Sequence, residues 1–367
     1  MLTANHYVWL KHRSQMKIFR NLAIVAWFGV LLLSQTVHMP AWAQSSENTE
    51  RGEFYGAIET THPDWFKESF LDFEEDIAEA EAQGKRLVLY FHQDGCPYCN
   101  VLVEDNFKNP NILSFMQDNF DLIAINMWGD REVVQVGGQL FTEKTLAAAL
   151  NVDFTPTLLF FSEDREVVFR LDGYRPPDEF THILNYVAGQ KEREYSYPEY
   201  LAAVSESDST TPLSQPGWPV LELFDLSQTG ARPLAVLFEE PDCEACQLLH
   251  EKTFKDEGAA PILEQFNLVR YNRWSEDPVV RPDGTASTIR QWSQDLGIGF
   301  TPAIVLYGTG GQQVIVLDAM FKTFHVLGAL EYVASGAYQH QPSFQRYLSE
   351  RADLIRESGQ DVDIWRY

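Results

Sequence analysis

Apolar runs of strand length recur along the chain and are separated by stretches with helical spacing. The clearest run, Leu87–Phe91, is continuously apolar, which is typical of a parallel strand buried on both faces. A turn at 162–165 separates two further runs. The additional predicted strands in this half are Leu122–Met127, Thr157–Phe161 and Val167–Leu171.

Helices are predicted where apolar residues recur at intervals of three or four positions. The first follows Asp64 and stops at Gly84, and its apolar stripe consists of Phe66, Phe70, Phe73, Ile77 and Ala80. Later predicted helices are Thr142–Leu150, Pro177–Val187 and, near the C-terminus, Phe344–Ile355.

The same order of residues occurs twice along the chain. The two copies match at one constant offset and, after the loss of a single residue, at an offset one shorter. Such a register predicts a tandem duplication, and hence an α/β protein with two domains, each a central mixed sheet flanked by helices. Matched pairs include Phe91 with Phe238, Cys96 with Cys243, Cys99 with Cys246, Trp128 with Trp274, Thr155 with Thr301, and Pro156 with Pro302.

The length of 367 residues exceeds one typical core and agrees with two domains. We predict an export signal over 1–43, a first domain over 44–190, and a linker over 191–219 that is rich in Ser, Thr and Pro toward its end. The second domain spans 220–367 and includes a C-terminal helical tail. It has no obvious counterpart of the first predicted helix.

The N-terminus has the pattern of an export signal. Basic residues up to Arg20 precede an apolar stretch from Leu22 to Leu33, and Ala41-Trp42-Ala43 offers small residues for cleavage. An uncleaved anchor is the weaker alternative, because a spanning helix needs about 20 apolar residues. We therefore expect a periplasmic protein in an oxidising compartment.

Charge narrows the range of partners. The formal net charge is -25, and an acidic surface repels phosphate backbones and anionic lipid. Nucleic acid and membrane surfaces are therefore not expected as partners.

All 4 cysteines stand in two C-x-x-C pairs, each shortly after an apolar run. A cysteine at a helix N-terminus meets unpaired backbone N–H groups and the positive end of the helix dipole, which both favour the thiolate. We predict that Cys96, at an exposed position, and Cys243 are nucleophiles. Cys99 and Cys246, one turn deeper, would resolve mixed disulfides. These residues predict thiol–disulfide exchange through Cys96–Cys99 and Cys243–Cys246, and we expect no other cofactor and no metal.

A C-x-x-C pair after a buried strand, with a downstream Thr-Pro pair before another strand, resembles the thioredoxin-like superfamily. The stretch from Phe91 to Tyr174 looks most like periplasmic, SoxW-like proteins of sulfur-oxidation systems. In that family the proline is cis and faces the disulfide, and the residue before it pairs with substrate backbone. The resemblance implies substrate-binding roles for Thr155, Pro156, Thr301 and Pro302. Tyr98 is expected at the mouth of the first site or simply at the surface.

Two positions depart from thioredoxin itself. Gly95 and Asp242 stand where thioredoxin has a tryptophan before its first cysteine, and Tyr90 and Leu237 replace its buried acid. The usual proton acceptor is therefore not expected. His92, at the end of a strand, is either its replacement or a polar cap.

The two pairs differ in the charge around them. Only Asp94 lies close to Cys96 in sequence, whereas four acids surround Cys243, and negative charge raises the pKa of a thiol. We therefore predict a lower reduction potential for the second pair and electron transfer from the second domain to the first. The same acids also fit a second domain with an idle disulfide. They are Glu239, Glu240, Asp242 and Glu244.

Other functions stay open. Two C-x-x-C pairs can hold one zinc ion, although such pairs usually lie closer in sequence. Copper delivery lacks a supporting methionine or histidine cluster. His250 is either a ligand or, as we expect, a solvated side chain. A binding or chaperone module with structural disulfides is the alternative class. The resemblance favours a reductase or isomerase over an oxidase, acting on thiol or disulfide client proteins and supplied by a membrane thiol electron carrier.

Overall fold

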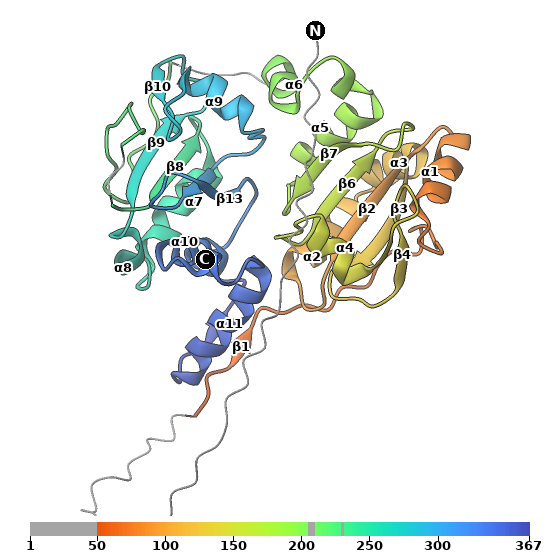
Figure 1. Cartoon of the computed structure of the whole chain (residues 1–367), viewed down its shortest axis with the longest axis horizontal. Helices are drawn as coiled ribbons and strands as arrows, with labels where there is room; N and C mark the ends of the chain where they lie inside the picture. Colours follow the sequence, from red (N-terminus) through yellow and green to blue (C-terminus); the bar gives the residue numbers. More distant parts are fainter. Residues whose placement is uncertain (1–49, 205–209, 229–230) are drawn as a thin grey trace, which may run out of the picture. The chain divides into compact units, whose positions relative to one another are not determined.

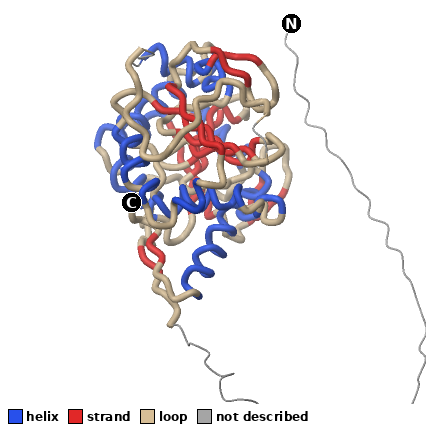
Figure 2. Tube along the Cα trace, turned by 90° about the vertical axis from the view of Figure 1, so that its left-hand side faces the viewer, coloured by secondary structure: helices blue, strands red, loops and turns tan. Residues whose placement is uncertain are grey.

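The computed structural model of the chain describes residues 50–204, 210–228 and 231–367. The predicted export signal lies outside the described residues. Two four-stranded sheets form the centre of the described part (Figure 1), and most helices lie outside these sheets (Figure 2). Within these ranges, every helix is too short or too polar to cross a membrane.

The first sheet has the strand order β3-β2-β6-β7. Its central strand, β2 (Arg86–His92), pairs in parallel with β3 (Phe120–Asn126) and antiparallel with β6 (Thr157–Phe161), and β7 (Val167–Asp172) forms the edge. The rest of this domain consists of α1 (Phe73–Ala82), α2 (Pro97–Val101), the π-helical turn η1 (Leu102–Phe107), α3 (Pro110–Asn119), β4 (Glu132–Val134), β5 (Leu140–Thr142), α4 (Glu143–Ala149), α5 (Pro177–Ala188) and η2 (Lys191–Arg193).

The second sheet repeats this topology in the order β13-β12-β8-β9, which confirms the predicted tandem architecture. Its central strand β8 (Leu234–Glu239) again has one parallel and one antiparallel neighbour. The remaining elements are α7 (Glu244–Glu251), η3 (Thr253–Lys255), α8 (Ala260–Leu263), β9 (Asn267–Asn272), β10 (Pro278–Val280), β11 (Ala286–Thr288), α9 (Ile289–Asp295), β12 (Ala303–Tyr307), β13 (Gln313–Leu317), α10 (Thr323–Ala334) and η4 (Ala337–Gln339).

Successive residues of β2 face two different cores. Val88 and Tyr90 belong to the apolar cluster on one face, and Leu87, Leu89 and Phe91 belong to the cluster on the other. The predicted strand is therefore covered on both sides. Because both faces are packed, the strand is a rigid support for the residues that follow it.

The first helix begins later than its apolar stripe predicts. α1 starts at Phe73, and the Asp72 carboxylate caps it by accepting hydrogen bonds from the N–H groups of Glu74 and Glu75. Phe70, predicted to lie on the buried stripe, is 99% exposed, so that part of the prediction was wrong.

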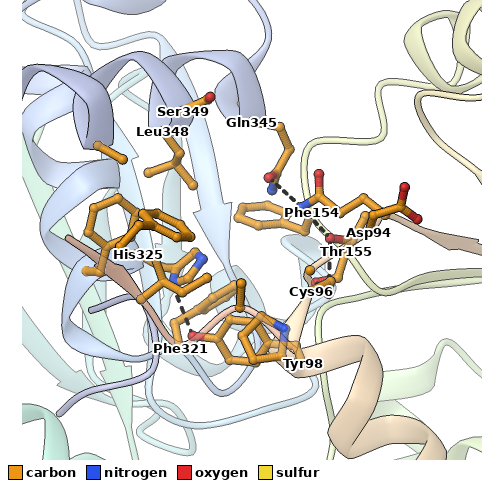
Figure 3. A pocket seen from close by; sticks show the side chains of 18 of the residues that line it. Asp94, Cys96, Tyr98, Phe154, Thr155, Phe321, His325, Gln345, Leu348 and Ser349 are labelled. Carbon is orange, nitrogen blue, oxygen red and sulfur yellow. Dashed lines mark hydrogen bonds between the residues drawn. The ribbon is translucent and has the colours of Figure 1, made fainter. Parts of the chain in front are cut away.

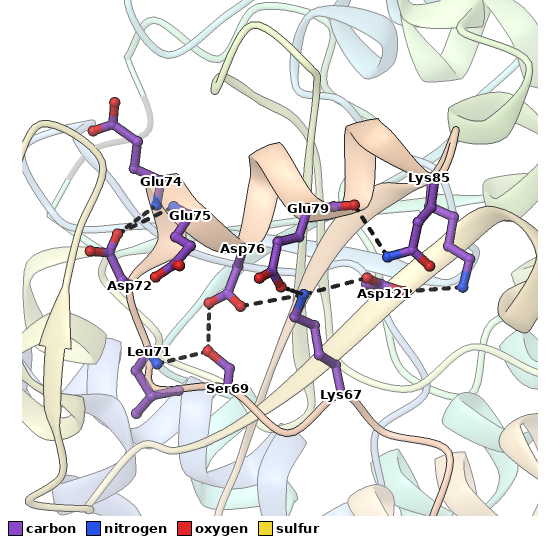
Figure 4. A network of polar contacts seen from close by, with 11 residues as sticks. Lys67, Ser69, Leu71, Asp72, Glu74, Glu75, Asp76, Glu79, Lys85 and Asp121 are labelled. Carbon is purple, nitrogen blue, oxygen red and sulfur yellow. Dashed lines mark hydrogen bonds and ion pairs between the residues drawn. The ribbon is translucent and has the colours of Figure 1, made fainter.

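A polar network holds the chain before α1 in a non-helical path (Figure 4). The Lys67 ammonium lies 2.6 Å from the Glu79 carboxylate. It also lies 3.6 Å from the carboxylates of Asp76 and Asp121. The Ser69 hydroxyl donates to Asp76 at 2.6 Å. A helix extended through these residues would have to break this set of bonds, and apolar spacing alone carries no information about them.

The segment predicted as linker contains a helix, α6 (Tyr197–Val204). Tyr197 and Leu201 are buried in the core of the first domain. Further along, the Leu221 N–H donates to the Leu268 carbonyl of β9, so this part of the chain runs beside the second sheet.

The two ends of the described chain pair with each other. β1 (Phe54–Tyr55) lies parallel to β14 (Val362–Asp363), next to the C-terminal helix α11 (Phe344–Glu357) (Figure 1). The Phe344 ring lies 5.6 Å from the Phe154 ring of the first domain. The C-terminal helix, predicted as a tail of the second domain, therefore also contacts the first.

Candidate active sites

The first cysteine pair lies where β2 is followed by α2. Cys96 occupies the N-cap of α2, and a disulfide joins it to Cys99 in the first helical turn. The Cys99 N–H lies 3.0 Å from the Cys96 sulfur. Pro97 fits the first helical position because its missing N–H would have no partner there. The helix start therefore favours a thiolate at Cys96 once the pair is reduced.

The second pair repeats this geometry at the junction of β8 and α7. Cys243 caps α7, forms a disulfide with Cys246, and lies 3.0 Å from the Cys246 N–H. The sulfurs are thus paired within their own domains rather than gathered around one ion. In the described part of the chain, no three or more His, Cys, Asp or Glu side chains are placed to hold a metal.

Both Thr-Pro peptide bonds implied by the resemblance are cis. The Thr155 carbonyl oxygen lies 3.6 Å from the Cys96 sulfur, and the Thr301 carbonyl oxygen lies 3.6 Å from the Cys243 sulfur. Each pair precedes a strand that is antiparallel to the central strand of its sheet, so the sheet register brings it beside the cysteines. The two cis bonds are Thr155–Pro156 and Thr301–Pro302.

The two nucleophile positions differ in access to solvent. Cys96 was expected to be exposed, and this was wrong, because only 4% of it is accessible. Cys243 is partly exposed, whereas its partner Cys246 is buried. Residues of the second domain, including α11, line a pocket together with Cys96, and the sequence of one repeat cannot reveal neighbours supplied by the other.

A pocket of about 360 Å³ lies beside Cys96 between the two domains (Figure 3). We call it the interdomain pocket. The labelled side chains in Figure 3 converge on it from α2 and the loop before it, from the loop before β6, from α10 and the loop before it, and from α11. Its lining includes Cys96, Tyr98 and Thr155 of the first domain, and Phe321, His325, Gln345 and Leu348 of the second.

Tyr98 lines the interdomain pocket and is buried, so the surface alternative does not apply. Its hydroxyl accepts a hydrogen bond from the Lys322 N–H at 2.7 Å and lies 3.2 Å from Nδ1 of His325. Burial raises the pKa of Tyr98 above its usual range, and burial together with Arg351 lowers the pKa of His325 to about 3. Both side chains are therefore neutral at physiological pH. The contact is a neutral polar link between the domains.

His92 was considered as a replacement proton acceptor. Its ring lies 4.3 Å from the ring of His62, and burial, with His62 and Arg131 nearby, lowers the pKa of His92 to about 3. A group with so low a pKa is a weak base at neutral pH, which argues against this role.

His250 is buried rather than solvated, which corrects the prediction. Its Nε2 lies 2.7 Å from the Glu239 carboxylate, and Glu239 also accepts a hydrogen bond from Nε of Arg270 at 2.7 Å. Helical spacing placed His250 on α7, but spacing alone does not reveal a buried acid at the end of the adjacent strand. Glu239 is thus held by two partners.

Gln93 was not among the predicted site residues, and Glu240 was considered only for its charge. Both side chains contact the threonine that precedes the cis-proline of their own domain, at distances of 3.0 and 2.8 Å. The signal was present in the repeat, because the register that pairs the cysteines also pairs these two positions.

A second pocket of about 280 Å³ lies beside the second site, and we call it the Glu179 pocket. Burial, offset by Arg175 and reinforced by Glu240, raises the pKa of Glu179 to about 7. The buried Oε2 atom of Glu179 has no hydrogen-bond partner among the described residues. Its lining includes Glu179 and Tyr197 of the first domain, and Glu240, Arg273, Trp274 and Thr301 of the second.

A mixed sheet, a C-x-x-C disulfide at the helix after its central strand and a cis-proline beside that disulfide define the thioredoxin-like class. A model of the thioredoxin-like domain matches residues 73–188 and 222–334, more than half of the chain. The chain therefore belongs to the thioredoxin-like family, with two such domains in tandem. None of the curated proteins matches it.

Solved structures give weaker likenesses. A thioredoxin-fold protein from Helicobacter pylori has 21% identity and a TM-score of 0.30, covering 33% of this chain and 80% of its own. A thioredoxin from Thermus thermophilus has 24% identity and a TM-score of 0.25, covering 37% and 87%. The first two thioredoxin domains of Eps1p from Saccharomyces cerevisiae have 15% identity and a TM-score of 0.23, covering 67% and 88%.

Proposed function

We propose that the protein is an exported thiol–disulfide oxidoreductase with a redox-active pair in each domain. The observation that supports this most directly is a shared geometry. In both domains a cysteine caps a helix, and a threonine carbonyl lies 3.6 Å from its sulfur. The helix start favours the attacking thiolate. The threonine carbonyl would accept a hydrogen bond from the backbone of a bound client.

In the reducing direction the reaction has two steps. The thiolate of Cys96 or Cys243 attacks a client disulfide, forms a mixed disulfide and releases one client thiolate. The thiolate of Cys99 or Cys246 then attacks that nucleophilic cysteine, releases the second client thiolate and closes the C-x-x-C disulfide. Two electrons pass to the client. A dithiol donor must then supply two electrons to reduce the C-x-x-C disulfide again.

The two sites would accept substrates of different size. Cys96 is reached through a pocket of about 360 Å³, a volume within the usual range of small-molecule sites. A small disulfide or an extended peptide segment fits such a site better than a folded surface does. Cys243 is partly exposed and would accept larger partners.

The compartment, the donor and the direction are also part of the proposal. The N-terminal pattern supports export to the periplasm, where a membrane thiol carrier would supply electrons. Reduction or isomerisation of disulfide-bearing client proteins is favoured over oxidation by the resemblance to periplasmic thioredoxin-like proteins.

A binding module with structural disulfides is the second candidate. The burial of Cys96 and Cys99 favours it for the first domain, because a disulfide with so little solvent access exchanges slowly. Lability separates the two functions. A structural pair would survive mild reductant, whereas a catalytic pair would reduce readily.

Trapping tests the proposal. Cys99→Ser and Cys246→Ser variants, expressed in the native host, should each accumulate mixed disulfides with client proteins or small thiols, because the resolving step is blocked. Cys96→Ser/Cys99→Ser and Cys243→Ser/Cys246→Ser variants are the matched controls and should capture nothing at the disabled pair. Capture on one variant only would restrict activity to that domain. An absence of capture, together with disulfides that resist glutathione in the wild type, would refute the oxidoreductase proposal.

A further inference from the structure

Gln93 and Glu240 occupy equivalent positions, each directly after the central strand of its sheet. Each side chain bridges an indole N–H and the hydroxyl of the threonine before the cis-proline. The surroundings match closely between the domains, but one side chain is an amide and the other a carboxylate. This difference decides which group receives the single hydrogen bond that the threonine hydroxyl can donate.

In the first domain, fixed partners orient the Gln93 amide. The Trp128 indole can only donate, and its Nε1 lies 2.8 Å from Oε1 of Gln93, so the amide oxygen faces Trp128. The amide NH₂ group therefore faces Thr155 and donates to its Oγ1 at 3.0 Å. Because Thr155 accepts this bond, its own proton is free. The Thr155 hydroxyl lies 3.4 Å from the Cys96 sulfur and points that proton toward it.

Gln345 on the C-terminal helix α11 (Figure 3) orients the second hydrogen of the Gln93 NH₂ group. Nε2 of Gln345 on α11 donates to the Asp153 carbonyl at 3.0 Å, so the Gln345 amide oxygen faces Gln93. That oxygen accepts from Nε2 of Gln93 at 3.0 Å. Every group in this chain of hydrogen bonds is thus oriented by a donor or acceptor that cannot reverse.

In the second domain the direction is reversed. Glu240 accepts from the Trp274 indole N–H at 2.9 Å and from the Thr301 hydroxyl at 2.8 Å. The Thr301 hydroxyl has a single proton, and because it donates that proton in the hydrogen bond to Glu240, it has none to donate to Cys243. Nε of Arg273 lies 3.5 Å from Glu240 and offsets part of its charge.

We propose that Gln93 and Glu240 are positioning residues that direct the threonine proton toward Cys96 and away from Cys243, and thereby stabilise the first thiolate relative to the second. The inference rests on the proposed thiol–disulfide exchange. A hydrogen bond to a charged acceptor is stronger than one to a disulfide sulfur, so Gln93 favours the reduced first pair. At redox equilibrium, electrons then favour the first pair over the second. The Cys243–Cys246 dithiol is oxidised to its disulfide as the Cys96–Cys99 disulfide is reduced to its dithiol.

The test exchanges the two side chains in the full-length protein. Q93E is made with Cys243→Ser/Cys246→Ser, and E240Q with Cys96→Ser/Cys99→Ser, so that each pair is observed alone. The thiolate pKa is followed by ultraviolet absorbance, and the equilibrium with glutathione gives the potential. Q93E should raise the Cys96 pKa by roughly one unit. The equilibrium constant with glutathione should then change by up to about tenfold, which lowers the reduction potential of the pair by about 30 mV. E240Q should lower the Cys243 pKa by a similar amount.

Threonine variants separate hydrogen-bond direction from charge. Thr155→Val removes the donor and should reproduce most of the Q93E effect, and Q93E added to Thr155→Val should then shift the Cys96 pKa little further. Thr301→Val should leave the Cys243 pKa nearly unchanged, because its proton does not serve that sulfur. Gln345→Ala breaks the bond to α11 without removing the Gln93–Thr155 bond, and controls for the loss of that contact in Q93E.

The outcomes distinguish this inference from the proposed function. A full Q93E shift in the Thr155→Val background would mean that charge acts alone and would overturn the inference. Unchanged reduction potentials in both Q93E and E240Q would also overturn the inference. If Q93E does not fold, an unchanged reduction potential in Thr155→Val would overturn it instead. If both wild-type pairs exchange with glutathione in these cases, the oxidoreductase proposal survives. If neither pair exchanges with glutathione, the proposed function fails first.

Discussion

Replacing Glu179 with glutamine tests how the Glu179 pocket controls the pH dependence of stability. The buried carboxyl of Glu179 has a pKa of about 7, raised by burial above its ordinary 4.5. Between these two values the folded state holds a proton that the unfolded state has released. The free energy of unfolding therefore falls as pH rises through this window. The difference between the two pKa values corresponds to about 3 kcal/mol, which is an upper figure for the effect.

Glu179→Gln keeps the shape of the side chain and removes its titration. Near pH 4.5 the wild type holds a neutral carboxyl, so the two proteins should have similar stability. Near pH 8 the wild type holds a buried charge and the variant does not, so the variant should be more stable by up to about 3 kcal/mol. Urea unfolding, followed by tryptophan fluorescence across this pH range, measures the difference.

Two controls make the result specific. Asp178→Asn, at an exposed position beside Glu179 on α5, should leave the shape of the stability profile unchanged. Glu240→Gln should lower the Glu179 pKa, because the Glu240 charge helps to raise it. If the profiles of Glu179→Gln and wild type run parallel from pH 4.5 to 8, the carboxyl does not titrate in this window and the argument is refuted.

Three further predictions concern contacts between the domains. Gly173 has a φ of +78°, and a Cβ there would lie 2.5 Å from the Ala319 side chain, so Gly173→Ala should cost about 1–3 kcal/mol in urea unfolding. Tyr98→Phe should also lower the free energy of unfolding by about 1–3 kcal/mol, because it removes the acceptor of the Lys322 backbone N–H. An unchanged free energy of unfolding would contradict a stabilising role for this hydrogen bond. After reduction, a small alkylating reagent should modify both Cys96 and Cys243, whereas a polymer-linked maleimide should modify only Cys243, as read by mass spectrometry. Equal labelling by the bulky reagent would show that Cys96 is not enclosed.

The sequence predicted those parts of the fold that local pattern controls. β6 (Thr157–Phe161) has the predicted bounds, because a continuously apolar run between turn residues has no other place than a buried strand. The C-x-x-C pairs fall at helix starts for the same local reason. The cis state of Thr155–Pro156 followed only from the resemblance, since nothing in the dipeptide itself fixes it.

The remaining features depend on what one repeat packs against. Phe70 matches a helical stripe, but ion pairs of Lys67 hold the chain before α1 away from the core. His250 lies on a helical face that also matches solvent exposure, and only a buried Glu239 makes burial favourable there. The enclosure of Cys96 depends on side chains more than two hundred residues away, such as His325. Periodicity within one segment contains no information of this kind.

Duplication of one fold has thus produced two chemically different surroundings for the same motif. At the first site, α11 and the start of α10 narrow the approach to Cys96, and Gln345 also holds the Gln93 amide that orients Thr155. Access and hydrogen bonding at Cys96 therefore depend on contacts between the domains. At the second site, Cys243 is more open, and its threonine is oriented by Glu240 within the same domain. If the domains separate, the first site should lose both its narrow approach and its fixed hydrogen bonds, whereas the second keeps the orientation of Thr301.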